Sequence, residues 1–156
     1  MTIYAFEAQE TWLPTVVGLP CGAIEVDGET LRLHFGTTRT AADGVIEAER
    51  TISLHGVWRV ERAESVVAGS GDHQGRDTQE LLSFLHSTSL ERFEVGQPGF
   101  DLDLYFSGQI TVRCFPCDSA EFAEDMDEDD DFLISWWIDG DGVSDDWEEP
   151  YDPPGV

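Results

Sequence analysis

Apolar and polar residues alternate along two separate stretches of the chain, in the pattern of half-buried β-strands. In the first stretch, Leu31, Leu33 and Phe35 fall on one face, while Arg32 and His34 fall on the other. Strands with one apolar and one polar face are typical of antiparallel sheets that cover a core on one side. The pattern therefore predicts burial of the three apolar side chains and solvent exposure of Arg32 and His34.

Further strands are predicted before and after this run. A hairpin signal, Asp27-Gly28, precedes it, and Gly36 is expected to end it. The remaining strands predicted for this part of the chain cover residues 23–26, 51–54 and 57–61. The segment before them is expected to be irregular, because Pro14 and Pro20 interrupt it.

The second half of the chain repeats this pattern. The matched positions are Glu25-Val26 with Glu94-Val95, Leu31-x-Leu33-x-Phe35 with Leu102-x-Leu104-x-Phe106, Ile52-x-Leu54 with Ile110-x-Val112, and Trp58 with Trp136-Trp137. We therefore suspect two half-repeats, at about residues 21–62 and 90–139, within a single domain of residues 1–156.

A polar loop and a helix are expected to join the two halves. Asp77 suits the N-cap position of such a helix, and Glu80 completes a pair that resembles a capping box. The apolar stripe of Leu81, Leu82, Phe84 and Leu85 predicts a docked helix within residues 77–88. The predicted fold class is α+β and mainly antiparallel β: a small sandwich or partly open barrel made from two similar β-meander halves, each of four strands, with one docked helix.

Three short runs give the chain a loose resemblance to a known group of proteins. They are Leu31-Arg-Leu-His-Phe-Gly36, Gly56-Val-Trp-Arg-Val60 and Leu102-Asp-Leu-Tyr-Phe106. Over about residues 18–138, the chain resembles small acidic bacterial β-rich proteins of unknown function, including immunity proteins that neutralise polymorphic toxins. The resemblance implies a non-enzymatic, partner-binding role, and it carries no site residue over to this chain.

Negative charge is concentrated in the acidic C-terminal segment, residues 118–156. The formal net charge is −25, from 33 acidic and 8 basic residues, and the last basic residue is Arg113. The C-terminal segment contains 16 acidic residues and no basic ones. Such a field repels nucleic acid and anionic membranes, and it attracts basic protein surfaces. Adaptation to high salt is an alternative, but it would spread the acidic residues over the whole surface.

The chain shows no targeting or membrane-spanning signal. No stretch approaches the roughly 20 apolar residues of a membrane span, and the first residues lack the basic and apolar regions of a signal peptide. The three cysteines form an odd set, which argues against a disulfide framework. We therefore expect a cytoplasmic protein.

Two acidic runs bracket an apolar strand at residues 132–138. Alternation places Phe132, Ile134, Trp136 and Ile138 on one face, so that Trp137 would lie on the other face among carboxylates. Aromatic residues inside an acidic rim are typical of a protein-binding surface, although the chain's own tail is an alternative cover for Trp137. The predicted partner-binding residues are Asp127, Asp129, Asp130, Asp131, Trp137, Asp139, Asp141, Asp145, Asp146 and Trp147.

The run Cys114-Phe115-Pro116-Cys117 is the sharpest local motif. It resembles the C-x-P-C element of thioredoxin-type redox proteins, but no β-α-β unit precedes it and acidic surroundings would raise the pKa of a thiolate. Zinc binding would need a second close pair of ligands beside Cys114 and Cys117, and the chain has none. Alternation instead places Cys114 on a buried face.

The first functional hypothesis is a binding protein that neutralises a basic protein, most specifically an immunity protein or inhibitor of a bacterial toxin. Its carboxylates would occupy a cationic cleft, as in a nuclease, in place of phosphates. A DNA mimic that inhibits a nucleic-acid-binding protein is a variant, and a metal or redox protein that uses Cys114 and Cys117 is an alternative of another class. The sequence contains no common catalytic motif, and we expect neither enzymatic activity nor a cofactor.

Overall fold

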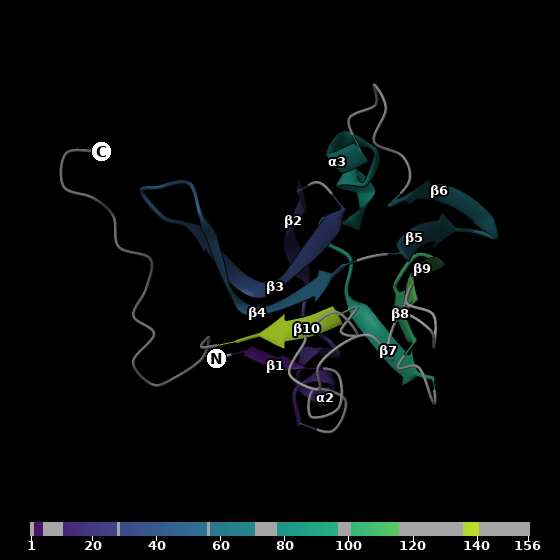
Figure 1. Ribbon diagram of the computed structural model, residues 1–156, viewed down its shortest axis with the longest axis horizontal. Helices are drawn as coiled ribbons and strands as arrows, with labels where there is room; N and C mark the ends of the chain where they lie inside the picture. Colours follow the sequence, from purple (N-terminus) through teal and green to yellow (C-terminus); the bar gives the residue numbers. More distant parts are fainter. Residues whose placement is uncertain are drawn as a thin grey trace, which may run out of the picture.

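The protein, in a computed structural model that describes residues 2–4, 11–27, 29–55, 57–70, 78–96, 101–115 and 136–140, contains two five-stranded sheets (Figure 1). The first sheet consists, in spatial order, of β1 (Thr2–Tyr4), β10 (Trp136–Asp139), β4 (Ile46–Leu54), β3 (Thr30–Thr40) and β2 (Cys21–Asp27). The second consists of β6 (Ser65–Gly69), β5 (Val57–Arg62), β9 (Ile110–Phe115), β8 (Leu102–Phe106) and β7 (Leu90–Val95). Every pair of neighbouring strands is antiparallel.

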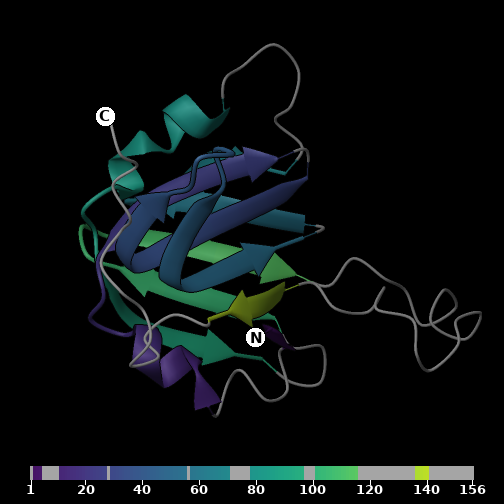
Figure 2. The same cartoon turned by 90° about the vertical axis from the view of Figure 1, so that its left-hand side faces the viewer.

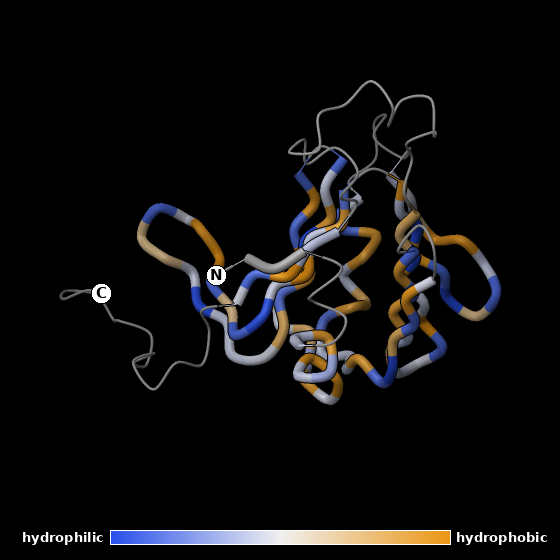
Figure 3. The backbone as a smooth tube through the Cα atoms, turned by 60° about the horizontal axis from the view of Figure 1, so that its bottom comes forward, coloured by the Kyte–Doolittle hydropathy of each residue, from blue (hydrophilic) through white to orange (hydrophobic). Residues whose placement is uncertain are grey.

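The two sheets pack face to face around one core, so the predicted small β-rich sandwich is confirmed (Figure 2). The six side chains predicted to form this core are at most 3% exposed: Leu31, Leu33, Phe35, Leu102, Leu104 and Phe106. The rings of Phe35 and Phe106 stack across the two sheets with their centroids 6.0 Å apart. Hydrophobic and hydrophilic positions follow one another along the strands (Figure 3), as two half-solvated sheets require.

Each half of the chain forms a three-stranded meander and contributes its fourth strand to the other sheet. β5 follows β4 along the chain but pairs with β9, and β10 follows β9 but pairs with β4. The expected four-stranded meanders are therefore three-stranded. The exchange covers the open edge of each meander, and it buries Trp58 of β5 and Trp136 of β10 in the shared core.

Strands β2, β3, β4 and β10 have the same order and register as β7, β8, β9 and β5. This register makes Ile52 equivalent to Val112, so the expected match of Ile52 with Ile110 is wrong by two residues. A register irregularity follows Cys21 in β2 and Leu90 in β7, and these two residues lie opposite Phe35 and Phe106 respectively. Trp58 in β5 therefore occupies the same position in the second sheet that Trp136 in β10 occupies in the first. On the outer faces, the equivalent pairs are Glu25 and Glu94, Arg32 and Asp103, His34 and Tyr105, Thr51 and Thr111, Ser53 and Arg113, Trp137 and Arg59, and Asp139 and Glu61.

Reciprocal hydrogen bonds join the two halves where β2 and β7 begin. The backbone N–H of Gly18 donates to the carbonyl of Leu90 at 2.8 Å, and the N–H of Ser87 donates to the carbonyl of Cys21 at 3.0 Å. Gly18 precedes Cys21 at the same spacing at which Ser87 precedes Leu90. Contacts that are repeated in both directions are what an approximate two-fold axis between similar halves produces.

The predicted docked helix is present as α3 (Thr78–Leu81), which is followed by the 3₁₀-helix η1 (Ser83–Leu85). Its apolar stripe buries Leu82 and Leu85 completely. Asp77, the expected N-cap, lies outside the described residues.

A second short helix, α2 (Leu13–Val16), occupies a segment that was expected to be irregular. Pro14 lies in its first turn, where a missing N–H removes no helical hydrogen bond. Leu13 and Val16 are both fully buried, so the segment packs onto the core despite its proline. Among the described residues, no helix is long and apolar enough to cross a membrane.

Candidate functional site

The β3–β4 hairpin continues past Gly36, where the sequence had indicated the end of a strand. The ladder is irregular between Phe35 and Thr38, which marks a β-bulge. Gly36 has a φ of +81°, and a Cβ atom at this position would lie 2.7 Å from the Glu49 carboxyl carbon. Only glycine fits this backbone without strain. The continued hairpin extends the outer face of the first sheet beyond the core.

A cavity of about 710 Å³ lies on this outer face, which is the side away from the shared core. We call it the His34 pocket. The sheet contributes Glu25, His34 and Thr51, and the acidic or basic residues that complete the lining are Arg32, Arg39, Asp43, Glu47 and Asp139. Its size lies within the range of roughly 300–1,000 Å³ that is typical of ligand pockets.

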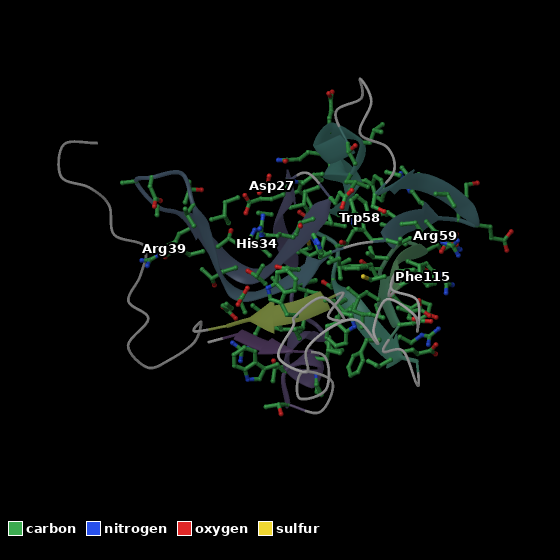
Figure 4. The ribbon with its side chains drawn as sticks, in the orientation of Figure 1. Asp27, His34, Arg39, Trp58, Arg59 and Phe115 are labelled. Carbon is green, nitrogen blue, oxygen red and sulfur yellow. The ribbon has the colours of Figure 1, made fainter. Side chains whose placement is uncertain are left out.

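His34, labelled in Figure 4, belongs to β3 and forms two hydrogen bonds inside this pocket. Its Nε2 lies 2.6 Å from Oε1 of Glu25, and its Nδ1 lies 2.8 Å from Oγ1 of Thr51. A carboxylate accepts hydrogen bonds, so Nε2 carries the proton and Nδ1 accepts from the hydroxyl of Thr51. The ladder explains the arrangement, because Thr51 lies directly opposite His34 and Glu25 lies diagonally across from it.

The prediction that His34 faces solvent is wrong, because its exposed fraction is only 2%. Desolvation by burial lowers the pKa of His34, and the hydrogen bond and charge of Glu25 oppose this effect without cancelling it. The imidazole is therefore neutral near neutral pH. It orients the Glu25 carboxylate without neutralising its charge.

Carboxylate, histidine and hydroxyl are connected here in the order of a catalytic triad. Nucleophilic catalysis of that kind also needs hydrogen-bond donors for a developing oxyanion. Thr51 lies in a central strand, with His34 opposite it in β3 and Asp139 opposite it in β10. Its own backbone polar groups are therefore committed to the sheet ladders. The geometry suits a fixed, negatively charged binding group better than an activated nucleophile.

Two of the predicted partner-binding residues lie in β10, and both are on or beside this face. Trp137 is partly exposed and lies between Ser53 of β4 and Tyr4 of β1 in the register, while its neighbours Trp136 and Ile138 are fully buried. Asp139, opposite Thr51, lines the His34 pocket. The other predicted contact residues lie outside the described part of the chain: Asp127, Asp129, Asp130, Asp131, Asp141, Asp145, Asp146 and Trp147.

The outer face of the second sheet has a network of ion pairs at its centre. The guanidinium of Arg113 lies 2.5 Å from Glu61 and 3.2 Å from Asp103, and Arg59 lies 3.2 Å from the same Glu61 carboxylate. Opposite charges are thus already matched within the chain. This face offers a partner little unbalanced charge.

At the edge of the second sheet, Glu94 and Tyr105 repeat the geometry of Glu25 and His34. The Tyr105 hydroxyl donates to Oε2 of Glu94 at 3.3 Å. Here, however, Arg92 neutralises the carboxylate at 2.7 Å and also lies over the Tyr105 ring, 3.7 Å from its centroid. The same framework therefore holds a neutralised carboxylate in one sheet and an orienting imidazole in the other.

Cys114 lies on the inner face of β9 and is 1% exposed, as the alternation predicted. Cys21 is also buried, and desolvation raises the pKa of its thiol to about 12. Cys117 lies outside the described residues. Within the described ranges, no group of three or more histidine, cysteine, aspartate or glutamate residues could hold a metal ion. The buried Cys21 thiol stays protonated, whereas metal binding and thiol chemistry need the thiolate.

The His34 pocket was not evident from the sequence, because its residues come from four strands, two of which form a hairpin that continues through a bulge. One feature of the sequence pointed towards Glu25. It matches Glu94 in the suspected repeat, which indicates that this position has a similar environment in both halves of the chain. No family model, no curated protein and no solved structure matches the chain.

Proposed function

We propose that this protein is a non-enzymatic acidic binding protein that neutralises a basic protein partner, most specifically as an immunity protein or inhibitor of a bacterial toxin. One observation carries the proposal. Trp137 and Asp139 of β10 lie on or beside the outer face of the first sheet, next to a pocket in which carboxylates outnumber arginines. Strongly acidic runs, at residues 124–131 and 139–146, flank the apolar stretch of residues 132–138 that leads into β10.

The contrast between the two outer faces supports a binding role for the first sheet. In the second sheet, Arg113 and Arg59 neutralise Glu61 and Asp103 within the chain. The His34 pocket has four carboxylates against two guanidinium groups, an excess of two negative charges. Unbalanced charge of this kind attracts a partner of opposite charge and accelerates association.

The position of Trp137 supports the same face as the contact surface. Its neighbours Trp136 and Ile138 anchor β10 in the core, so the backbone that carries Trp137 is fixed before a partner arrives. A rigid, partly exposed tryptophan loses little conformational freedom on binding, and tryptophan is among the residues that most often dominate interface energies.

The test is association kinetics at low and moderate salt, with a basic partner first identified by pull-down. Substituting asparagine for Asp127, Asp129, Asp130 and Asp131 should slow association and flatten its salt dependence, because these carboxylates act through the long-range field. The matched control makes the same change in net charge elsewhere: Glu64→Gln, Glu80→Gln, Glu91→Gln and Asp101→Asn. Equal effects of both sets, or association that is insensitive to salt, would contradict the proposal.

A DNA mimic is a variant of this proposal in which the partner binds nucleic acid. Duplex DNA would then compete with the protein for the partner, whereas a toxin without a nucleic-acid site would show no competition. The alternative metal or redox role is tested separately: Cys114→Ser with Cys117→Ser should leave partner binding intact, and one zinc per chain that this pair of changes abolishes would favour the alternative.

A further inference from the structure

We propose that the His34 pocket receives the guanidinium group of an arginine that projects from the partner protein. This inference rests on the proposed function and specifies the residue type by which the pocket recognises its partner. It requires a cavity, unbalanced negative charge, a carboxylate held in position, and room for a planar cation.

The charge of the pocket favours a cation. Glu25, Asp43, Glu47 and Asp139 supply four carboxylates, and the two guanidinium groups in the lining belong to Arg32 and Arg39. Arg39 is hydrogen-bonded to Glu47 at the hairpin wall.

Neither arginine neutralises the whole pocket. Arg32 forms its ion pair with Asp27 at 3.5 Å, and Asp27 is not part of the lining. The residues that line the cavity carry a formal charge of −2, and its volume of about 710 Å³ leaves room for a side chain from another molecule.

The second sheet shows how this framework accommodates a guanidinium group. There, Arg113 of β9 lies between Glu61 and Asp103. At the equivalent positions, the first sheet keeps a carboxylate, Asp139 in place of Glu61, but carries Ser53 in place of Arg113 and Arg32 in place of Asp103. The carboxylate is retained, the guanidinium is not supplied by this strand, and Asp139 borders the cavity.

Glu25 is prepared for a strong directional contact. His34 holds one carboxylate oxygen at 2.6 Å and is itself held by Thr51 at 2.8 Å. A carboxylate has about four lone-pair sites, so it keeps acceptor capacity after this bond. A planar guanidinium matches carboxylates through paired hydrogen bonds, whereas an ammonium group acts as a point charge, so the pocket should prefer arginine to lysine.

A depression on the second sheet, where Tyr105 and Thr111 take the positions of His34 and Thr51, serves as an internal control. It has a volume of about 500 Å³, and its lining includes Tyr105, Thr111 and a single carboxylate, Glu64. The same strand geometry without the cluster of carboxylates should not bind a guanidinium. Binding should therefore be confined to one of the two faces.

The experiment is an NMR titration of ¹⁵N-labelled protein with the peptide acetyl-Gly-Ser-Arg-Ser-Gly-amide, and with the same peptide carrying neutral citrulline or lysine in place of arginine. The arginine peptide should give saturable shifts of the backbone amides of His34, Thr51 and residues 43–48. The citrulline peptide should bind at least tenfold more weakly, and the lysine peptide should lie between the two.

Two variants test the assignment within the protein. Glu25→Gln should weaken binding of the arginine peptide at least fivefold, and Asp43→Asn, which leaves the His34 network intact, should weaken it about twofold. Glu91→Gln is the matched control, because it removes one exposed carboxylate from the edge of the second sheet. Equal shifts with arginine and citrulline, or shifts spread over both sheets, would overturn the proposal.

The outcomes separate this inference from the function on which it rests. If a basic partner binds and neither Glu25→Gln nor Asp43→Asn changes its affinity, the arginine pocket is refuted while the proposed function stands. The opposite outcome is that the arginine peptide saturates the pocket, while Trp137→Ala and the four asparagine substitutions do not weaken binding of a basic partner. In that case the arginine pocket is supported and the proposed contact surface is refuted.

Discussion

The outer faces of the two sheets share a strand order and a register, but they differ in how far their carboxylates are paired with arginines of the same sheet. In the second sheet, Arg113 neutralises Glu61 and Asp103, and Arg92 neutralises Glu94. In the first sheet, the position of Arg113 is taken by Ser53, and the place of Tyr105 is taken by a buried histidine. The outer face of the first sheet has a pocket whose lining carries a net negative charge. On the outer face of the second sheet, the carboxylates named above form ion pairs with arginines of the same sheet.

This difference shows that the shared strand order and register determine which side chains are neighbours. A few differences in residue type then decide whether a carboxylate at such a position is neutralised by an arginine of the same chain. Glu25 and Glu94 occupy equivalent positions, and each accepts a hydrogen bond from the equivalent residue of the next strand, His34 or Tyr105. Among the residues that the structure describes, an arginine lies at hydrogen-bond distance from the second carboxylate and not from the first. A surface whose charges are matched internally is stable, and a surface whose charges are unmatched is available to a partner.

The largest expected effect tests whether the two halves are equivalent in packing. Trp58→Ala and Trp136→Ala should each lower the free energy of unfolding by about 3–5 kcal/mol, because each removes a buried tryptophan from an exchanged strand. Urea unfolding monitored by circular dichroism measures the loss. Trp137→Ala, in the same strand but partly exposed, is the control and should cost much less. A small effect of Trp136→Ala beside a large effect of Trp58→Ala would show that the exchanged strands contribute unequally.

The next prediction compares the two faces in partner binding. Trp137→Ala should weaken binding by about 2 kcal/mol, roughly 30-fold, mainly through faster dissociation, because its contacts exist only in the docked complex. Arg59→Ala changes the equivalent position of the second sheet and should leave the dissociation rate unchanged. Surface plasmon resonance with the identified partner measures both. An effect of Arg59→Ala as large as that of Trp137→Ala would remove the distinction between the faces.

A pair of matched substitutions tests the two hydrogen-bonded carboxylates. His34→Phe should lower the free energy of unfolding by about 1–3 kcal/mol, because Glu25 and Thr51 lose their partner in a buried setting. Tyr105→Phe should change it by no more than about 0.5 kcal/mol, because the bond from Tyr105 to Glu94 is long and exposed. Similar losses for both variants, measured by urea unfolding, would mean that burial does not separate the two networks.

The smallest expected effect is a pH dependence that belongs to the first sheet alone. The unfolded chain binds a proton at His34 near the ordinary pKa of about 6.5, whereas desolvation lowers the pKa of this residue in the folded protein. Between these two pKa values the unfolded state binds more protons, so the stability that His34 contributes is present above about pH 6.5 and is lost as the pH falls.

The slope from this one group cannot exceed about 1.4 kcal/mol per pH unit. Urea midpoints of the wild type between pH 7.5 and 5.5 should therefore fall more steeply than those of His34→Gln. His86→Gln is the control, because His86 is exposed. Parallel pH profiles of the wild type and His34→Gln would show that the imidazole titrates normally in the folded protein.

Much of the fold could be predicted from the sequence, because local chemistry determines the individual strands. Period-two alternation identified the buried faces at Leu31 to Phe35 and at Leu102 to Phe106, and it placed Cys114 in the core. An apolar stripe located the helix that begins at Thr78. These features depend on residues close together in the chain, whose spacing alone decides which side chains share a face.

The sequence also placed Trp137 in a strand between two acidic runs and Asp139 at the start of the second run, but only the tertiary structure decided what surrounds them. Pairing between β4 and β10, far apart along the chain, brought Asp139 beside Thr51. The bulge beyond Phe35 carried the hairpin on to form the pocket, and the neighbours of His34 in three dimensions excluded water from a side chain whose alternation indicated solvent. Alternation distinguishes the two faces of a strand, whereas burial depends on what other segments place over that face, and no local pattern encodes it.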